Sequence, residues 1–147
     1  SRIMSLKDGI KKMSKSDPSD LSRINLTDDK SEILNKIKKA KTDPLPLPEE
    51  AKDLAKRPEA ENLLEIYSSL KNQNLETSVS EFRGKNFSEF KGKLSEALTE
   101  KIEPISKEIK KLLNDEKYLD TILLEGSDKA DKIASKKIKE IKELVGF

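Results

Sequence analysis

The stretch that decides the fold runs from residue 86 to residue 112 and reads NFSEFKGKLSEALTEKIEPISKEIKKL. Asn86 followed three positions later by Glu89 resembles the capping box that opens many helices. Apolar residues then recur every three or four positions, which places them on one helical face: Phe90, Leu94, Leu98, Ile102, Ile105, Ile109 and Leu112. The spacing predicts a long amphipathic helix whose apolar face other helices must cover.

Shorter stretches before this helix repeat the same pattern. Asp29 with Glu32 forms a second capping-box signature, and the apolar face that follows is Ile33, Leu34, Ile37 and Ala40. A further face is Leu63, Leu64, Tyr67 and Leu70, and Pro48 suits the first turn of that helix. Between these two helices, alternating prolines over residues 43–48 exclude helix and predict a stiff connector.

Two more helices are expected after residue 112. Tyr118, Ile122 and Leu123 indicate a helix that stops at Gly126. Ser127 can cap a last helix that ends at Gly146, a position typical of a C-terminal glycine cap. Its inner face would consist of Ala130, Ile133, Ala134, Ile138, Ile141 and Val145. Only Arg2–Leu6 suggests a strand, and residues 7–20 suggest a polar loop. The predicted fold is an all-α helical bundle with a non-helical leader.

Composition narrows the possible chemistry. Of 147 residues, 39% are charged, 33% hydrophobic and 4% aromatic, so the core is lean and built mainly from Ile and Leu. No Cys and no His occur, which excludes disulfides, Cys/His zinc sites, a Cys nucleophile and a histidine base. We expect no protein-held metal. No apolar run approaches the roughly 18 residues that span a bilayer, and the composition suits the cytoplasm. The chain begins Ser1-Arg2 without an initiator Met, so we expect it to be part of a longer protein.

One segment departs from the helical pattern, and it reads KKMSKSDP from residue 11 to residue 18. Two or three ammonium groups alternate here with two hydroxyls. Ammonium groups act as point charges toward phosphate, and hydroxyls add short hydrogen bonds. Such a loop suits a polyphosphate whose charge grows during a displacement. The simpler alternative is a solvated Lys/Ser loop with no ligand.

The exact string favours the first interpretation. Residues 12–16 read KMSKS, the signature of class I aminoacyl-tRNA synthetases, and the whole chain resembles the bacterial-type tryptophanyl-tRNA synthetases. The stretches that carry the resemblance besides the signature are RIMSL at 2–6, DP at 17–18, KTD at 41–43, RPEAENLLEIY at 57–67 and EIKELVGF at 140–147. The family's HIGH-type signature and tryptophan pocket have no counterpart here. The chain is therefore similar to the carboxyl-terminal portion of these enzymes.

The resemblance implies a reaction and a set of residues. The carboxylate of L-tryptophan attacks the α-phosphate of ATP, pyrophosphate leaves, and the adenylate passes its acyl group to tRNA(Trp). By position in the motif, Lys12 and Lys15 would be the catalytic residues that hold pyrophosphate. The expected ATP-binding residues are Ile3, Lys12, Met13, Ser14, Lys15 and Ser16, with Ile3 and Met13 near adenine. Mg²⁺ is expected on the phosphate oxygens rather than in a protein cage.

The resemblance also implies two domains. Residues 1–24 would be the edge of a Rossmann-like α/β catalytic domain, and residues 25–147 a helical anticodon-binding domain. The expected partners are tRNA(Trp) and ATP, with L-tryptophan bound through residues that this chain lacks, and no membrane. Only the full enzyme is expected to form a homodimer. We expect the chain alone to be inactive in aminoacylation, because most of the catalytic half has no counterpart in it.

Several alternatives remain open at this point. The chain could be a free-standing helical RNA-binding module or a structural interaction domain. Tyr67, Phe82, Phe87 and Phe90 could stack on bases, although their spacing favours core packing. Two groups of lysines could face tRNA phosphates or only solvent: Lys36, Lys38, Lys39 and Lys41, and Lys132, Lys136, Lys137 and Lys139. No motif identifies the residues that read the anticodon.

Overall fold

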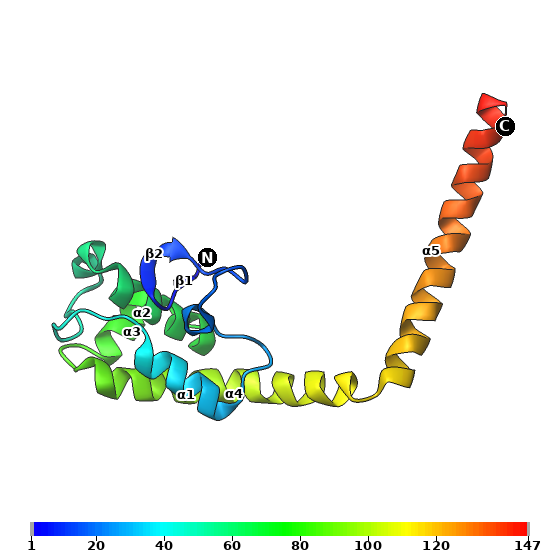
Figure 1. The fold of residues 1–147 in the computed structure, drawn as a ribbon. Coiled ribbons are helices and arrows are strands. Elements are labelled where there is room, and N and C mark those ends of the chain that lie inside the picture. Colours follow the sequence, from blue (N-terminus) through cyan, green and yellow to red (C-terminus); the bar gives the residue numbers. More distant parts are fainter. Residues whose placement is uncertain (1, 147) are drawn as a thin grey trace. The chain divides into compact units, whose positions relative to one another are not determined.

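Figure 1 shows the computed structural model, which describes residues 2–146. Strands β1 (Met4–Ser5) and β2 (Asp8–Lys12) come first and are followed by helix α1 (Lys30–Lys39). Helices α2 (Pro58–Lys71), α3 (Leu75–Glu81), α4 (Phe87–Leu113) and α5 (Glu116–Val145) complete the order, with short 3-10 helices at Asp20–Ser22 and Ala51–Lys56. Ser1, the first residue of one expected domain, and Phe147, the last residue of the other, lie outside the described residues. The mostly helical fold is confirmed.

The chain divides into two compact units, Ser1–Lys107 and Glu108–Phe147. The first unit holds the buried apolar core, which begins at Leu6, includes Leu47 of the connector and ends at Leu98 of α4. Three aromatic rings form its centre, with Phe82 lying 5.0 Å from Tyr67 and 4.8 Å from Phe90, both edge to face. Their core packing is confirmed, which removes them as base-stacking platforms. Phe87 is half-buried, and the guanidinium of Arg57 lies 5.9 Å above its ring.

The leader differs from the expected strand and loop. It forms an antiparallel hairpin in which Met4 pairs with Lys12 and Ser5 with Asp8. Helix α2 supports the free edge of this hairpin. The side-chain amide of Asn62 accepts from the Met4 N–H (2.8 Å) and donates to the Met4 carbonyl (3.0 Å). Asn62 is 58 positions from Met4 along the chain, and Gly9 of β2 lies close to the backbone of Pro58 and Glu59, so no local pattern could predict this hairpin.

The helix expected to begin at Pro48 begins instead at Pro58. Residues 51–56 form a 3-10 helix, and Pro58 occupies the first turn of α2. The connector at residues 43–48 is non-helical, as predicted. Arg57 holds it through hydrogen bonds to both carboxylate oxygens of Asp43 (2.9 and 2.7 Å) and to the Pro46 carbonyl (2.7 Å). Burial of Asp43 by itself would raise its pKa, but the hydrogen bonds from Arg57 and the Leu45 N–H lower it.

The capping prediction for helix α1 is confirmed. The Asp29 carboxylate accepts from the Glu32 N–H (2.9 Å), and the Glu32 carboxylate accepts in return from the Asp29 N–H (2.8 Å). At the start of α4, Asn86 likewise accepts from the Glu89 N–H (3.1 Å), while Glu89 turns its carboxylate toward Lys85. The buried face of α1 is narrower than expected, because Leu34 is 44% exposed. Helix α3 was not predicted, since its seven residues carry only one fully buried apolar side chain.

The expected break at Gly126 is wrong, because α5 runs without interruption from Glu116 to Val145. A glycine inside a helix costs about 1 kcal/mol relative to alanine, and strong helix formers on both sides outweigh that cost. Gly146 does end the helix. It has a φ of 82°, and its N–H donates a hydrogen bond to the Lys142 carbonyl. No described residue of α5 is buried, and the apolar residues predicted for its inner face are exposed.

A close approach at Gly9 leads to the first prediction. A Cβ at this position would lie 2.5 Å from the Glu59 nitrogen and the Pro58 carbonyl carbon, both of which are backbone atoms. We expect Gly9→Ala to lower the free energy of unfolding by about 1–3 kcal/mol, because the hairpin must move off helix α2. Urea denaturation followed by tyrosine near-UV circular dichroism measures this change, since Tyr67 lies in the core.

Gly92→Ala serves as the matched control. Gly92 lies within helix α4, and a Cβ there meets nothing within 4 Å. This variant should be as stable as the parent chain, or more stable by up to about 1 kcal/mol. Equal stability of Gly9→Ala and the parent would contradict the docking of the hairpin on α2.

Candidate functional site

The KMSKS segment begins at the end of β2, and the hairpin sets its first residues. Lys12 lies opposite Met4 in the register, and the Met13 N–H donates to the Ile3 carbonyl (3.2 Å). Three of the expected ATP-binding residues, Ile3, Lys12 and Met13, are thus brought together by backbone pairing. Ile3 is 41% exposed, so its side chain is accessible at this edge.

The two serines of the segment form a tight turn. The Ser14 and Ser16 hydroxyl oxygens lie 2.8 Å apart, and the Ser14 hydroxyl also accepts from the Ser16 N–H (3.3 Å). The Asp17 N–H donates to the Ser14 carbonyl (3.4 Å). These bonds are all local, so the turn is defined by its own residues rather than by a neighbouring helix.

The Lys12 and Lys15 ammonium groups are the free charges of the segment. Both residues are exposed, and no carboxylate within residues 2–146 lies within 4.0 Å of either group. Lys11 differs, because its ammonium group lies 3.7 Å from Asp17. Met13, Ser14 and Lys15 also line a hollow of about 520 Å³, whose remaining wall comes from Arg23, Ile24, Asn25, Leu26 and Thr27. The uncompensated Lys15 at this hollow, with a second uncompensated cation three residues earlier at Lys12, can attract an anionic ligand.

Asp17 keeps its charge next to this hollow. Its carboxylate accepts from the Ser19 N–H (2.8 Å). That hydrogen bond, aided by the charges of Lys11, Lys7 and Arg23, lowers the pKa of Asp17. The carboxylate therefore neutralises Lys11 and leaves Lys12 and Lys15 available.

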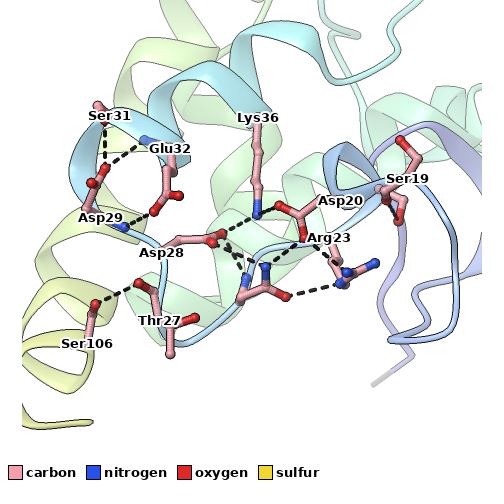
Figure 2. Close-up of polar contacts among 12 residues, drawn as sticks. Ser19, Asp20, Arg23, Thr27, Asp28, Asp29, Ser31, Glu32, Lys36 and Ser106 are labelled. Atoms are coloured by element: carbon pink, nitrogen blue, oxygen red, sulfur yellow. Dashed lines mark hydrogen bonds and ion pairs between the residues drawn. The ribbon is translucent and has the colours of Figure 1, made fainter. Parts of the chain in front are cut away.

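An ion-pair network joins Asp20 and Asp28 to helix α1 (Figure 2). The Lys36 ammonium group contacts Asp28 at 2.6 Å and Asp20 at 2.7 Å, and its side chain is only 4% exposed. Burial alone would lower the pKa of Lys36, but the hydrogen bonds to Asp20 and Asp28 outweigh burial and raise it. Lys36 is therefore not available to tRNA phosphates, and this candidate from the sequence is wrong.

Further contacts complete the network. Arg23 donates to Asp20 (3.0 Å), to the Asn25 side chain (3.1 Å) and to the Asp17 carbonyl (2.9 Å). The Ser106 hydroxyl of α4 donates to the Thr27 carbonyl (3.0 Å). Sequence reasoning missed Asp20, Arg23 and Asp28, because nothing in a polar segment shows which charged side chains pair with one another and which are only solvated.

The remaining candidate lysines differ in their surroundings. Lys41 is paired with Glu59 at 2.7 Å, whereas Lys38 and Lys39 are exposed. The lysines of α5 are exposed as well, and two of them form pairs along the helix, Lys137 with Glu140 and Lys139 with Glu143. Within residues 2–146 no cluster of three acidic side chains could hold a metal ion, and no helix is long and apolar enough to cross a membrane.

The chain matches one family of proteins over most of its length. The family model described as "tRNA synthetases class I (W and Y)" matches residues 1–106. The chain belongs to this family.

Individual relatives narrow the similarity to the tryptophan branch. The tryptophan–tRNA ligase of Agrobacterium fabrum is 51% identical over 146 residues, which cover 99% of this chain and 41% of that protein. The ligase of Rickettsia conorii is 49% identical over 146 residues, 99% of this chain and 44% of that protein. A solved tryptophanyl-tRNA synthetase from Mycoplasma pneumoniae matches with a TM-score of 0.60 and 29% identity over 72% of this chain and 33% of that one. The resemblance inferred from the sequence is confirmed, and the chain spans about two-fifths of the length of the curated relatives it matches.

The ion-pair network predicts a response to acid. The hydrogen bond from Lys36 holds the pKa of Asp20 below its usual value of 3.8. A carboxylate with a lowered pKa stabilises the fold above about pH 4, and this contribution is lost as pH falls through the folded-state pKa. Asp20→Asn should therefore unfold at lower urea concentration near neutral pH and lose less stability than the parent as pH falls below about 4.

Asp120→Asn is the control for this experiment, because Asp120 is an exposed carboxylate of α5. It should leave both the neutral stability and the acid response of the core unchanged. If Asp20→Asn shows the same acid response as the parent, Lys36 does not stabilise the charged form of Asp20.

Proposed function

We propose that this chain is the carboxyl-terminal part of a tryptophan–tRNA ligase. The full enzyme would activate L-tryptophan with ATP, release pyrophosphate, and transfer the tryptophanyl group to tRNA(Trp). The observation that carries the proposal is the 51% identity over 146 residues to a tryptophan–tRNA ligase, in a chain whose KMSKS turn keeps two unpaired ammonium groups. A free-standing RNA-binding or structural domain would need neither feature.

In this proposal Lys12 and Lys15 bind the β- and γ-phosphates and stabilise the charge that develops on the leaving pyrophosphate. Their exposure and the absence of a carboxylate partner in the described chain leave both groups available for that role. Fixed positive charge at a developing negative charge is among the largest single contributions to catalysis. Mg²⁺ would arrive with ATP as part of the substrate, since Mg²⁺ commonly bridges phosphate oxygens and keeps several waters.

The other residues of the segment would orient the nucleotide. Ile3 and Met13, joined through a backbone hydrogen bond, would lie against adenine. Ser14 and Ser16 would shape the turn and contact phosphate, which is supported by the 2.8 Å contact between their hydroxyls. Residues 1–24 would thus belong to the catalytic domain, and residues 25–147 would form the helical anticodon-binding domain. A homodimer of the full enzyme would form through residues that this chain lacks.

The role of Lys15 can be tested in the full-length ligase. We expect Lys15→Ala to slow ATP–pyrophosphate exchange by about a hundredfold or more, because one preorganised charge at the leaving group is lost. The affinity for L-tryptophan, measured by equilibrium binding, should change little, since the loop would bind ATP and not the amino acid. Lys52→Ala, at an exposed residue outside the loop, is the control and should retain full activity. Equal losses of tryptophan binding and activation would contradict the proposed role.

The 147-residue chain by itself should bind tRNA weakly and form no tryptophanyl adenylate. Adenylate formation requires ATP and tryptophan held in line, and the residues for that are not in this chain. Binding through lysine–phosphate contacts should weaken steeply as salt concentration rises. The measurements are ATP–pyrophosphate exchange and a tRNA titration at two salt concentrations. Exchange activity of the chain alone would contradict the proposal, and salt-independent or absent tRNA binding would favour a structural domain.

A further inference from the structure

The two ends of the KMSKS turn are held in different ways. Its first residues are fixed by pairing within the hairpin, where the Met13 N–H meets the Ile3 carbonyl. Its last residues have no strand partner. The Asp17 carbonyl accepts instead from the Arg23 guanidinium (2.9 Å), while the Asp17 carboxylate is held by the Ser19 N–H and Lys11. Arg23 is thus the side chain that ties the backbone at the end of the turn to residues further along the chain.

The geometry of Arg23 leaves it little freedom. Its Nη1 donates to the Asp17 carbonyl, its Nη2 to Asp20, and its Nε to the Asn25 side chain. The side chain is only 18% exposed. A planar guanidinium that donates in three directions fixes the relative positions of all three acceptors, which a lysine ammonium on a flexible stem would not do.

The network continues from Arg23 to the core. Asp20 accepts from Arg23 on one carboxylate oxygen and from the buried Lys36 of α1 on the other (3.0 and 2.7 Å). Lys36 is fixed in turn by Asp28, whose side chain is 5% exposed. Figure 2 shows these side chains converging between α1 and the segment that follows the turn. An unbroken series of charge-assisted hydrogen bonds therefore joins helix α1 to the Asp17 carbonyl, two residues after Lys15.

Resting on the ligase function proposed above, we propose that Arg23 is a positioning residue for the KMSKS turn, and that Asp20 and Lys36 hold Arg23 in place from helix α1. Arg23 does not need to touch ATP in this role. It fixes the backbone two residues after Lys15. The Lys15 ammonium group is then already placed to bind the polyphosphate, and the loop does not have to rearrange. Small errors in such placement cost large factors in rate.

The simpler alternative is that the network only stabilises the fold around residues 17–36. The two roles differ in what they change. If the network only stabilises the fold, breaking it lowers the free energy of unfolding but leaves the turnover of folded enzyme intact. If the network positions the turn, breaking it lowers kcat of folded enzyme and leaves the KM for L-tryptophan unchanged, because the tryptophan pocket is elsewhere.

The experiment uses the full-length ligase and ATP–pyrophosphate exchange at saturating ATP, at a temperature where thermal unfolding shows every variant folded. Arg23→Lys keeps the charge but loses the fixed three-way geometry, and we expect kcat to fall about tenfold or more with the tryptophan KM unchanged. Arg57→Lys is the matched control. Arg57 is another largely buried arginine, hydrogen-bonded to Asp43 and the connector carbonyls, so its variant should lose stability but keep its kcat.

Asp20→Asn is the second variant, because Asp20 is 57% exposed and its replacement should not prevent folding. It should lower kcat as Arg23→Lys does, and the double variant should fall no further than the more affected single one, since both changes break one series of contacts. Unchanged kcat in both single variants, while Lys15→Ala is impaired, would overturn the positioning role and leave the ligase function intact. An equal kcat loss in Arg57→Lys would overturn it as well. Full activity of Lys15→Ala would overturn the proposed role of Lys15 and this inference together, and leave the ligase function intact.

Discussion

The hydrogen bonds between the Asn62 side chain and strand β1 are the contact on which the rest of the candidate site depends. A two-residue strand paired with one neighbour is marginal in water. The Asn62 amide satisfies the Met4 N–H and carbonyl on the edge that β2 leaves open, and Asn62 itself is only 3% exposed. A buried amide with both its donor and its acceptor used fixes strand β1 on helix α2 in one register, because a shift of the strand by one residue would leave these groups unpaired. The positions of Ile3, Lys12 and Met13 all follow from that register.

The site combines rigid supports with unsatisfied charge. The hairpin is fixed on helix α2, and the residues after the turn are fixed on helix α1 through buried ion pairs. Between these supports, Lys12 and Lys15 have no carboxylate partner in the described chain, although 39% of the sequence is charged. The exposed lysines of the described chain differ in this respect: Lys41, Lys85 and Lys93 each have an acid within 4.0 Å, whereas Lys38 and Lys39 have none. Two neighbouring lysines without one are suited to bind a ligand that brings its own negative charge.

How far the sequence predicts the structure depends on the distance between the interacting residues. The caps at Asp29 and Gly146, the non-helical connector and the core aromatic residues depend on neighbours within a few positions, and those predictions are confirmed. Strand β2 and the burial of Lys36 depend on more distant partners, since Gly9 lies against the backbone of Pro58 and Glu59, and Lys36 pairs with Asp28 and Asp20. The KMSKS turn was found from its exact residue order, whereas Arg23 and Asp20, which hold its end, belong to no recognisable string.

Helix α5 shows that an apolar stripe in the sequence does not by itself place a helix in a core. Its apolar residues recur at helical spacing, yet none of its described residues is buried. Long isolated helices rely on intrinsic propensity and on charge pairs along one face, and Lys137 with Glu140 and Lys139 with Glu143 are pairs of this kind. The buried apolar residues of the described chain all lie between Leu6 and Leu98, and the ion pairs that follow the turn lie between Asp20 and Lys36. The contacts that fix the KMSKS turn therefore lie within residues 2–107.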